Sequence, residues 1–321
     1  MSAQIDVPTR DALLASLQPY PATAQIVSAL LDTWPEHEKY VRARFRTIDP
    51  GLEKRIDQLS ALALKDIGDQ LTEYCECYRW MCEAFVDEEI HFARHKEYRL
   101  SDFDEVYREV YSNPDIMRRY VRGILISQVI WEPHAKAFDY FRQEFLAKAP
   151  AGASYLEVGP GHGLFLYFAS QSANIAQLEA WDVSDSSIAE TRHALAKLGV
   201  SRDIEIVEQD VLRVPSRLEE FDMAVISEVL EHLERPDTAL QSLHAALKPG
   251  GRIFINAPVN SPAPDHIYLW RSTDEFVAFV EAQGFEIEQS VFLPVTGATL
   301  EKAQRRDLSI SCVVIGRKPE A

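Results

Sequence analysis

One short glycine-rich segment is the part of the sequence whose residue types and spacing most clearly suggest chemistry. It reads Leu156-Glu157-Val158-Gly159-Pro160-Gly161-His162-Gly163. The pattern predicts a strand that runs into a glycine turn, which then opens a helix. Glycine turns of this kind let a nucleotide-like ligand approach the backbone closely.

Two classes of cofactor compete for this turn. A dinucleotide fingerprint, G-x-G-x-x-G, requires a third glycine at position 164, which is Leu164. Pro160 also lacks the backbone N–H that a pyrophosphate would need. S-adenosylmethionine has no phosphate, and Glu157 is placed to hold its ammonium group, directly or through water. The turn therefore favours S-adenosylmethionine, with a strand–helix turn that binds nothing as the alternative.

Acidic residues follow the next two predicted strands. Asp182 comes 23 residues after Gly159, where a carboxylate can accept hydrogen bonds from both ribose hydroxyls. Val183 follows it directly. Asp210 can accept the exocyclic amine of adenine, and the backbone of Val211 offers a contact beside it. Each residue alone could be an ordinary strand end, but their order along a parallel sheet predicts one binding edge.

The chain changes character near residue 150, and we expect a helical domain over 1–150 and a second domain over 151–321. The first part reads at helical spacing, with one stripe from Leu52 to Phe85 bent at Gly68, and further helices at about 102–111 and 114–147. The second part alternates strands and helices, which predicts an α/β fold with a parallel sheet covered on both faces. Its strands are expected at 154–158, 178–183, 204–209, 221–227, 252–257, 285–293 and 308–316.

Composition excludes several classes of function. With 33 Lys and Arg against 50 Asp and Glu, the net charge of −17 disfavours binding to nucleic acid. No apolar run approaches the length of roughly 18 residues of a membrane span. Four cysteines make no disulfide framework. Residues 1–6 show no basic stretch followed by an apolar block, so we expect a cytoplasmic protein.

Residues 154–316 resemble the class I S-adenosylmethionine-dependent methyltransferases, in the branch that includes small-molecule enzymes of the ubiquinone-biosynthesis type. The resemblance covers about half of the chain and is specific for fold and cofactor, not for the acceptor. It is carried by residues 157–163, Asp182, Asp210, Glu228-Val229-Leu230-Glu231-His232 and Lys248-Pro249-Gly250-Gly251.

This resemblance implies a Rossmann-like sheet of seven strands whose last strand runs antiparallel. It also implies that S-adenosylmethionine is the cofactor. Gly159, Gly161 and Gly163 would approach its methionine part, Asp182 the ribose, and Asp210 with Val211 the adenine. Ser227 and Glu228 would face the cofactor and the reacting centre.

The reaction implied by this family asks mainly for positioning and exclusion of water, because the sulfonium is already activated. A base is needed only for an acceptor that holds its proton tightly. Glu228 and His266 are the candidates. His266 lies in a proline-bounded loop and can titrate near neutrality, although an ordinary loop histidine is an equal alternative. Glu231 and His232 are expected to have structural or orienting roles.

The helices before residue 150 are expected to cover the acceptor pocket as a lid. Tyr120, Trp131 and His134 precede the sheet in sequence, and Tyr268 follows the fifth strand. Aromatic rings there would stabilise a sulfonium through cation–π attraction. The alternatives are that these rings belong to a helical core or that the helices form a homodimer surface.

No metal site is expected. Glu88, His91 and His95 share a helical face, but this region contains no second motif of that kind. Cys75, Cys77 and Cys82 form no C-x-x-C pair. Magnesium-dependent methyltransferases of the catechol type have an acidic residue at the end of the fourth strand, followed by an Asp-Asn pair. Here Ser227-Glu228 leads to Glu231-His232 instead.

The sequence thus predicts a methyltransferase that acts on a small molecule, in secondary metabolism. One alternative is an intramolecular cyclase of the azetidine-2-carboxylate synthase type, which would release methylthioadenosine. Another is a catalytically silent protein in which S-adenosylmethionine only stabilises the fold. The reaction product distinguishes the three.

Overall fold

The computed structural model describes residues 9–111, 113–215 and 217–320. Residues 1–6, whose composition predicts no secretion signal, lie outside the described residues. Within the part of the chain that is described, no helix combines the length and apolar character needed to cross a membrane.

The first half of the chain is helical, as predicted, and its described residues before Ala153 form no strand. Its elements are α1 (Arg10–Ser16), α2 (Pro21–Thr33), η1 (Pro35–His37), α3 (Glu38–Arg44), α4 (Pro50–Ile67), α5 (Leu71–His95), α6 (Phe103–Val106), η2 (Tyr107–Tyr111), α7 (Pro114–Ile130), α8 (Glu132–Tyr140), η3 (Phe141–Phe145) and η4 (Leu146–Lys148).

Two predicted helices are each divided in the structure. The stripe from Leu52 to Phe85 forms α4 and α5 rather than one bent helix, because Gly68 adopts φ +66° and ψ −128° and so ends α4. The stretch 114–147 is divided at Trp131, where the backbone is extended. Pro133 lies in the first turn of α8, which suits a residue without an N–H group.

The second half forms the predicted seven-stranded sheet, in the order β3-β2-β1-β4-β5-β7-β6. Its last strand in the chain, β7, pairs antiparallel with β5 and β6, and the remaining pairs are parallel. The strands are β1 (Ala153–Val158), β2 (Ile175–Asp182), β3 (Glu205–Glu208), β4 (Phe221–Ser227), β5 (Leu247–Val259), β6 (Glu286–Pro294) and β7 (Ile310–Arg317).

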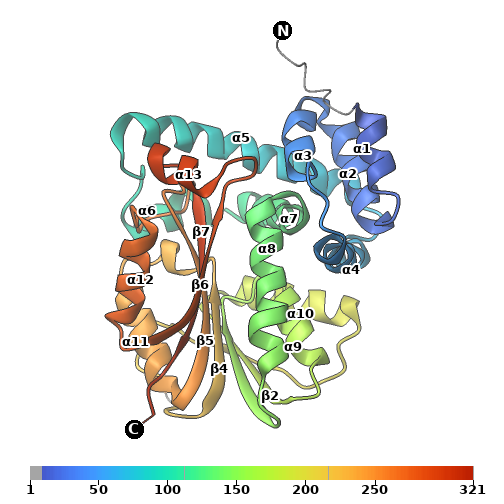
Figure 1. Cartoon of the computed structure of the whole chain (residues 1–321). Coiled ribbons are helices and arrows are strands. Elements are labelled where there is room, and N and C mark those ends of the chain that lie inside the picture. The colour runs from blue at the N-terminus through green and yellow to red at the C-terminus, as the bar shows by residue number, and fades with distance from the viewer. Residues whose placement is uncertain (1–8, 112, 216, 321) are drawn as a thin grey trace.

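Helices cover both faces of this sheet (Figure 1). One face carries α8, α9 (Leu164–Gln171) and α10 (Asp185–Leu198), and the other carries α11 (Pro236–Ala246) and α12 (Thr273–Glu281). The remaining elements are η5 (Leu230–His232), which follows β4, and α13 (Leu300–Arg306), which precedes β7.

The helical region and the sheet share a buried core. Phe141 and Phe145 of η3 pack against Phe254 of β5, with ring centroids 5.5 and 5.8 Å apart. The same apolar cluster continues without a break into the helices from α1 to α5. The helical region is therefore fixed to one face of the sheet through α8 and η3.

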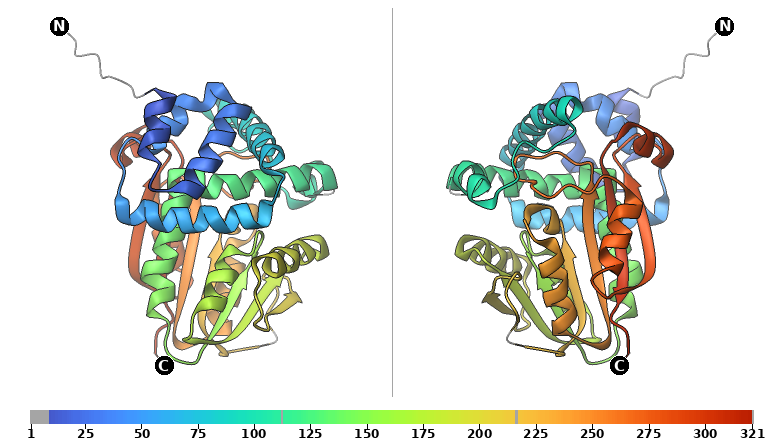
Figure 2. Two further views of the ribbon diagram at one scale, coloured as in Figure 1. Left: turned by 90° about the vertical axis from the view of Figure 1, so that its right-hand side faces the viewer. Right: turned by 90° about the vertical axis from the view of Figure 1, so that its left-hand side faces the viewer.

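The helices α5 and α7 lie across the end of the sheet where β1 and β4 terminate (Figures 1 and 2). Ligands of open α/β sheets bind at the carboxyl ends of the parallel strands. We call the helices α5, α7 and α8 the helical layer. This layer lies over the edge of the sheet at which the sequence predicts a binding site.

Candidate functional site

A cavity of about 640 Å³ lies between the sheet and the helical layer. The sheet contributes the glycine turn and the ends of β2 and β4, and the helical layer contributes side chains of α5, α7 and α8. This volume lies within the range of pockets that bind small molecules and cofactors.

The glycine turn forms one wall of the cavity. Gly159 and Gly161 line it, with φ of +67° and +48°. The N–H of Gly159 donates to the carbonyl of Trp181 at 2.9 Å, which continues the pairing of β1 with β2. A Cβ atom on Gly159 would lie 2.6 Å from Cγ2 of Val229. Only glycine therefore fits at this position, for steric as well as conformational reasons.

We expect Gly159→Ala to destabilise the protein more than Gly152→Ala. Both positions have positive φ, which costs an alanine about 1–2 kcal/mol, but a Cβ on Gly152 meets nothing within 4 Å. The clash with Val229 adds about 1–3 kcal/mol at Gly159. Thermal denaturation measures the difference between the two variants. The additional change Val229→Ala should restore part of the loss, and equal effects of the two glycine variants would contradict the steric argument.

Glu157 brings a buried carboxyl group to the cavity. Its side chain is 3% exposed, and the hydroxyl of Tyr155 donates to Oε2 at 2.9 Å. Burial raises the pKa of Glu157 to about 8, against the opposing effect of the Tyr155 hydrogen bond. A positively charged ligand group beside this carboxyl would favour its ionised form.

Asp182 lies at the end of β2 and also lines the cavity. Its Oδ1 accepts the N–H of Ser184 at 3.0 Å, and its Oδ2 accepts the hydroxyl of Ser187 at 2.7 Å. These two bonds hold the carboxylate at the first turn of α10.

Four of the predicted cofactor residues lie outside the lining of this cavity. Gly163 is the N-terminal cap of α9, and Val183 is 58% exposed. Asp210 accepts the N–H of Leu212, and Val211 is buried beside it in the sheet core. The structure thus brings together Glu157, Gly159, Gly161, Asp182 and Ser227, but not these four.

Glu228 adopts φ +54°, a strained conformation for a residue other than glycine. Its N–H donates to the carbonyl of Asn256 at 2.8 Å, and Nδ2 of Asn256 donates to its Oε1 at 2.8 Å and to Oγ of Ser227 at 3.1 Å. Burial raises the pKa of Glu228 to about 7, while His232 and Asn256 oppose this shift. Asn256 faces Ser227 in the register of β4 and β5, which sequence reasoning did not include.

The turn after β4 is tied to the loop after β5. The carbonyl of Glu231 accepts the N–H groups of Ile267 and Tyr268 at 2.9 and 3.0 Å. As a result the side chains of Glu231, His232 and His266 converge, with one potential ligand atom of each within 4.8 Å of the others. The sequence did not predict this cluster.

The hydrogen bonds of the two histidines define their tautomers. Nδ1 of His232 donates to the carbonyl of Asp265 at 3.0 Å, and Nδ1 of His266 donates to the carbonyl of Ser261 at 2.6 Å. Because a carbonyl can only accept, each Nδ1 carries the hydrogen. Burial lowers the pKa of His266 to about 4, so this ring is neutral at pH 7 rather than titrating near neutrality as the sequence suggested.

Glu231 is completely buried, and the only side-chain hydrogen bond available to its carboxylate is one shared with the carboxyl of Glu228. Burial and the nearby carboxyl of Glu228 raise its pKa well above the usual value. Two acidic side chains thus meet in an interior site where they can share a proton with each other. Buried polar groups without partners are rare and call for an explanation.

The predicted residues of the helical layer converge on the same cavity. Nε1 of Trp131 donates to the hydroxyl of Tyr78 at 2.8 Å. The hydroxyl of Tyr120 donates to Oδ1 of Asp265 at 3.2 Å. His134 is buried, with Nδ1 3.0 Å from Oγ of Ser127, and burial lowers its pKa to about 3.

Tyr268 is not brought to this cavity. Its ring packs against Trp270 and Phe279, with centroids 4.6 and 5.9 Å away, in the core of the other face of the sheet. The chain bends between His266 and Tyr268 because the backbone N–H groups of Ile267 and Tyr268 both donate to the carbonyl of Glu231. This bend turns His266 inward and Tyr268 away.

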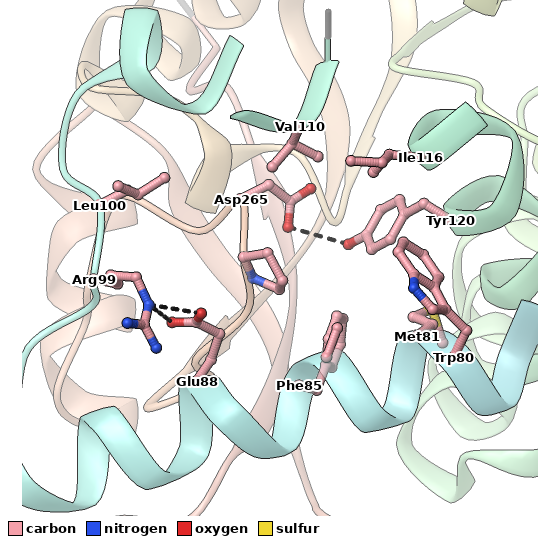
Figure 3. A pocket seen from close by; sticks show the side chains of 12 residues that line it. Trp80, Met81, Phe85, Glu88, Arg99, Leu100, Val110, Ile116, Tyr120 and Asp265 are labelled. Atoms are coloured by element: carbon pink, nitrogen blue, oxygen red, sulfur yellow. Dashed lines mark hydrogen bonds and ion pairs between the residues drawn. The ribbon is translucent and has the colours of Figure 1, made fainter. Parts of the chain in front are cut away.

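A smaller cavity of about 200 Å³ adjoins the first one and is mainly apolar (Figure 3). Asp265, Tyr120 and Phe85 line both cavities. Glu88 forms an ion pair with Arg99 at 2.9 Å on its wall. Glu88 thus pairs with Arg99 rather than with His91 or His95.

The larger cavity is lined by more acidic than basic side chains, and burial raises the pKa values of several of the acidic ones. No lysine or arginine occurs among the described residues that line it. Its lining includes seven acidic side chains, namely Glu83, Glu89, Glu157, Asp182, Glu228, Glu231 and Asp265. An acidic cavity with low-dielectric walls attracts cationic ligands.

Comparisons with known proteins point to the same family. A family profile described as a methyltransferase domain matches residues 156–255. The ubiquinone/menaquinone biosynthesis C-methyltransferase UbiE of Pseudomonas fluorescens is 27% identical over 152 residues, which cover 47% of this chain and 56% of that protein. The ubiquinone biosynthesis O-methyltransferase of Idiomarina loihiensis is 24% identical over 192 residues, or 53% of this chain and 76% of the relative.

Among solved structures, a SAM-dependent methyltransferase from Aquifex aeolicus matches with a TM-score of 0.43 and 17% identity, over 67% of this chain and 98% of its own. The chain spans about half the length of UbiE proteins that it matches. The match to the family profile falls on the sheet with its glycine turn, and the helices before residue 150 lie outside the matched residues. Residues 156–255 therefore match a methyltransferase domain, and this similarity supports S-adenosylmethionine as the cofactor.

Proposed function

We propose that this protein transfers the methyl group of S-adenosylmethionine to a small molecule that binds beneath the helical layer. One observation carries the proposal: a single cavity joins the glycine turn and Asp182 to Glu228 and then continues beneath aromatic side chains of the helices. The cavity thus has one end suited to the cofactor and another that is left for an acceptor.

The residues at the sheet end fit the cofactor. The backbone at Gly159 and Gly161 would admit the methionine part, the Glu157 carboxyl would bind its ammonium group, and the Asp182 carboxylate would accept from the ribose hydroxyls. We assign the adenine to the edge formed by Asp210 and Val211, which follow β3 next to β2.

The acceptor end is aromatic. Trp34, Tyr40, Phe85, Tyr120 and Trp131 line it from α2 to α7. Rings in this arrangement favour an acceptor with an apolar or planar part, and they attract the positive charge of a sulfonium. We propose that the helices from α2 to α8 serve as a lid over this pocket.

Bound S-adenosylmethionine would supply an activated methyl group. An acceptor lone pair would form the new bond to the methyl carbon as the carbon–sulfur bond breaks, and S-adenosylhomocysteine would leave with that electron pair. For an acceptor that must lose a proton, Glu228 is positioned as the base. Asn256 holds its Oε1, and its pKa of about 7 suits proton transfer near neutral pH. The buried walls exclude water from the reacting centre.

Cofactor binding should release a proton from Glu157. At pH 7 a carboxyl with a pKa of about 8 is mostly protonated, and the ammonium of the cofactor favours its ionised form. Affinity for S-adenosylhomocysteine, which carries the same ammonium, should therefore rise with pH up to about 8. Calorimetry in buffers of different ionisation enthalpy measures the proton released. The release should vanish in Glu157→Gln, and an unchanged release in that variant would refute this role.

Product analysis tests the proposed activity. The protein is incubated with S-adenosylmethionine and extracts of small molecules, and the products are separated by mass spectrometry. Methyl transfer gives S-adenosylhomocysteine only when an acceptor is present. Methylthioadenosine without any acceptor would establish the cyclase instead, and neither product despite binding would establish a silent protein.

We propose that the activity takes place in the cytoplasm and without a nucleic acid partner. The four cysteines are free, which suits a reducing cytoplasm, and the excess of acidic residues disfavours a nucleic acid partner. We further propose a role in secondary metabolism. We also propose that the helices before residue 150 form a homodimer contact. Size-exclusion chromatography with light scattering tests the dimer.

A further inference from the structure

We propose that Glu231, His232 and His266 bind a divalent first-row transition metal ion next to the methyl-transfer site. One potential ligand atom from each residue lies within 4.8 Å of the others. The cluster lines the larger cavity, on the same wall as Glu228.

The first argument is the state of Glu231. Its side chain is 0% exposed, and the only side chain that can share a hydrogen bond with its carboxylate is the neighbouring carboxyl of Glu228, which carries no positive charge. An uncompensated buried carboxylate is costly, and buried charges in proteins are paired or bind metal ions. The described lining of the cavity provides no lysine or arginine as a partner. A cation bound by Glu231 would compensate its buried negative charge.

The second argument is the orientation of the imidazole rings. Both histidines donate Nδ1–H to backbone carbonyls, those of Asp265 and Ser261, at 3.0 and 2.6 Å. Such a bond fixes the tautomer and leaves Nε2 with a lone pair for coordination, which is the usual arrangement around metal-bound histidine. Nε2 of His232 lies 3.8 Å from Oε1 of Glu231.

The surrounding hydrogen bonds hold the cluster in place before any ion arrives. The hydroxyl of Tyr98 accepts the N–H of Ser261 at 3.0 Å, and its ring lies 6.0 Å from that of His266. The carbonyl of Glu231 is fixed by two N–H groups from the loop that carries His266. Two separate segments are therefore locked together where their ligands meet.

The donor set indicates the kind of ion. Two imidazoles and a carboxylate, without a thiolate, suit Zn²⁺, Fe²⁺, Co²⁺ or Mn²⁺. Three protein ligands leave coordination positions open for oxygen. On the proposed function, this assigns an acceptor with a hydroxyl group, which the ion would polarise.

Cobalt binding to the full chain tests the site without relying on activity. Protein stripped with a chelator is titrated with Co²⁺, and the visible ligand-field absorption is followed. We expect one bound ion, with affinity reduced by more than about 100-fold in Glu231→Gln and in His266→Ala. The control is His95→Ala. This change removes one of the two histidines, His91 and His95, that contact each other on α5, and it should leave the binding unchanged.

Thermal denaturation gives a second readout of the same site. Glu231→Gln should be at least as stable as the metal-free wild type, because it removes a buried carboxylate that has only the carboxyl of Glu228 to share a proton with. Co²⁺ should raise the melting temperature of the wild type but not of this variant. A lower melting temperature of Glu231→Gln with no effect of Co²⁺ on either protein would mean that Glu231 and Glu228 merely share a proton.

Binding of S-adenosylhomocysteine is measured on the same samples. Its retention in His266→Ala and in Glu231→Gln shows that both variants are folded. Intact cofactor binding with no cobalt site, or with equal cobalt affinity in all variants, overturns the metal proposal alone. A cobalt site in a protein that does not bind S-adenosylhomocysteine would instead overturn the proposed function.

Discussion

Asp182→Asn is expected to weaken the binding of S-adenosylhomocysteine by about 100-fold. The carboxylate lines the cavity from the end of β2, and we assign it two hydrogen bonds to the ribose hydroxyls. Hydrogen bonds to a charged group contribute roughly 1.5–3 kcal/mol each, and an amide can replace only one acceptor. Isothermal titration calorimetry measures the change directly.

The matched control for this variant is Asp185→Asn. Asp185 lies three residues further along, in the first turn of α10, and is exposed. It should bind S-adenosylhomocysteine as the wild type does. Because the Asp182 carboxylate also holds Ser184 and Ser187, circular dichroism must show that α10 persists. A folded Asp182→Asn protein with unchanged affinity would rule out the assignment to ribose.

Glu228→Gln should lower the rate of methyl transfer by about 10²–10⁴-fold, the usual contribution of a general base. Glutamine keeps the shape of the side chain and can still accept from Nδ2 of Asn256. Affinity for S-adenosylhomocysteine should therefore change little, and the variant should lose turnover rate rather than cofactor binding. Initial rates at saturating cofactor measure it, once an acceptor has been identified by its product.

Glu190→Gln serves as the comparison, since Glu190 is an exposed carboxylate on α10 outside the cavity. Its rate should match the wild type. If Glu228→Gln transferred methyl groups at the wild-type rate with an acceptor that must lose a proton, the base would be another group. The strained backbone at Glu228 would then need a different explanation.

The fold could be predicted from local sequence because each signal lies within a few residues. The glycine turn, the buried apolar strands and their regular alternation with helices predicted the sheet, including its antiparallel last strand. Helix breaks were harder to place. Gly68 permits a bend or a full break within the same apolar stripe, and packing decides between them.

The candidate site was only partly predictable, because it depends on contacts between distant segments. His266 follows His232 by 34 residues, and the two rings meet through hydrogen bonds from Ile267 and Tyr268 to Glu231 and from His232 to Asp265. The expectation that no metal binds rested on local spacing, which such a cluster does not have. Tyr268 was placed in the pocket for the same reason, since nothing in the sequence shows where the loop bends.

Binding of the demethylated cofactor to the unmodified protein tests the central claim most directly. S-adenosylhomocysteine, NAD and ATP are titrated in turn into the full chain and followed by calorimetry. The acidic cavity, the G-x-G-x-G turn and Asp182 predict saturable binding of S-adenosylhomocysteine and none of the two phosphorylated nucleotides. Binding of NAD or ATP with no response to S-adenosylhomocysteine would contradict the account.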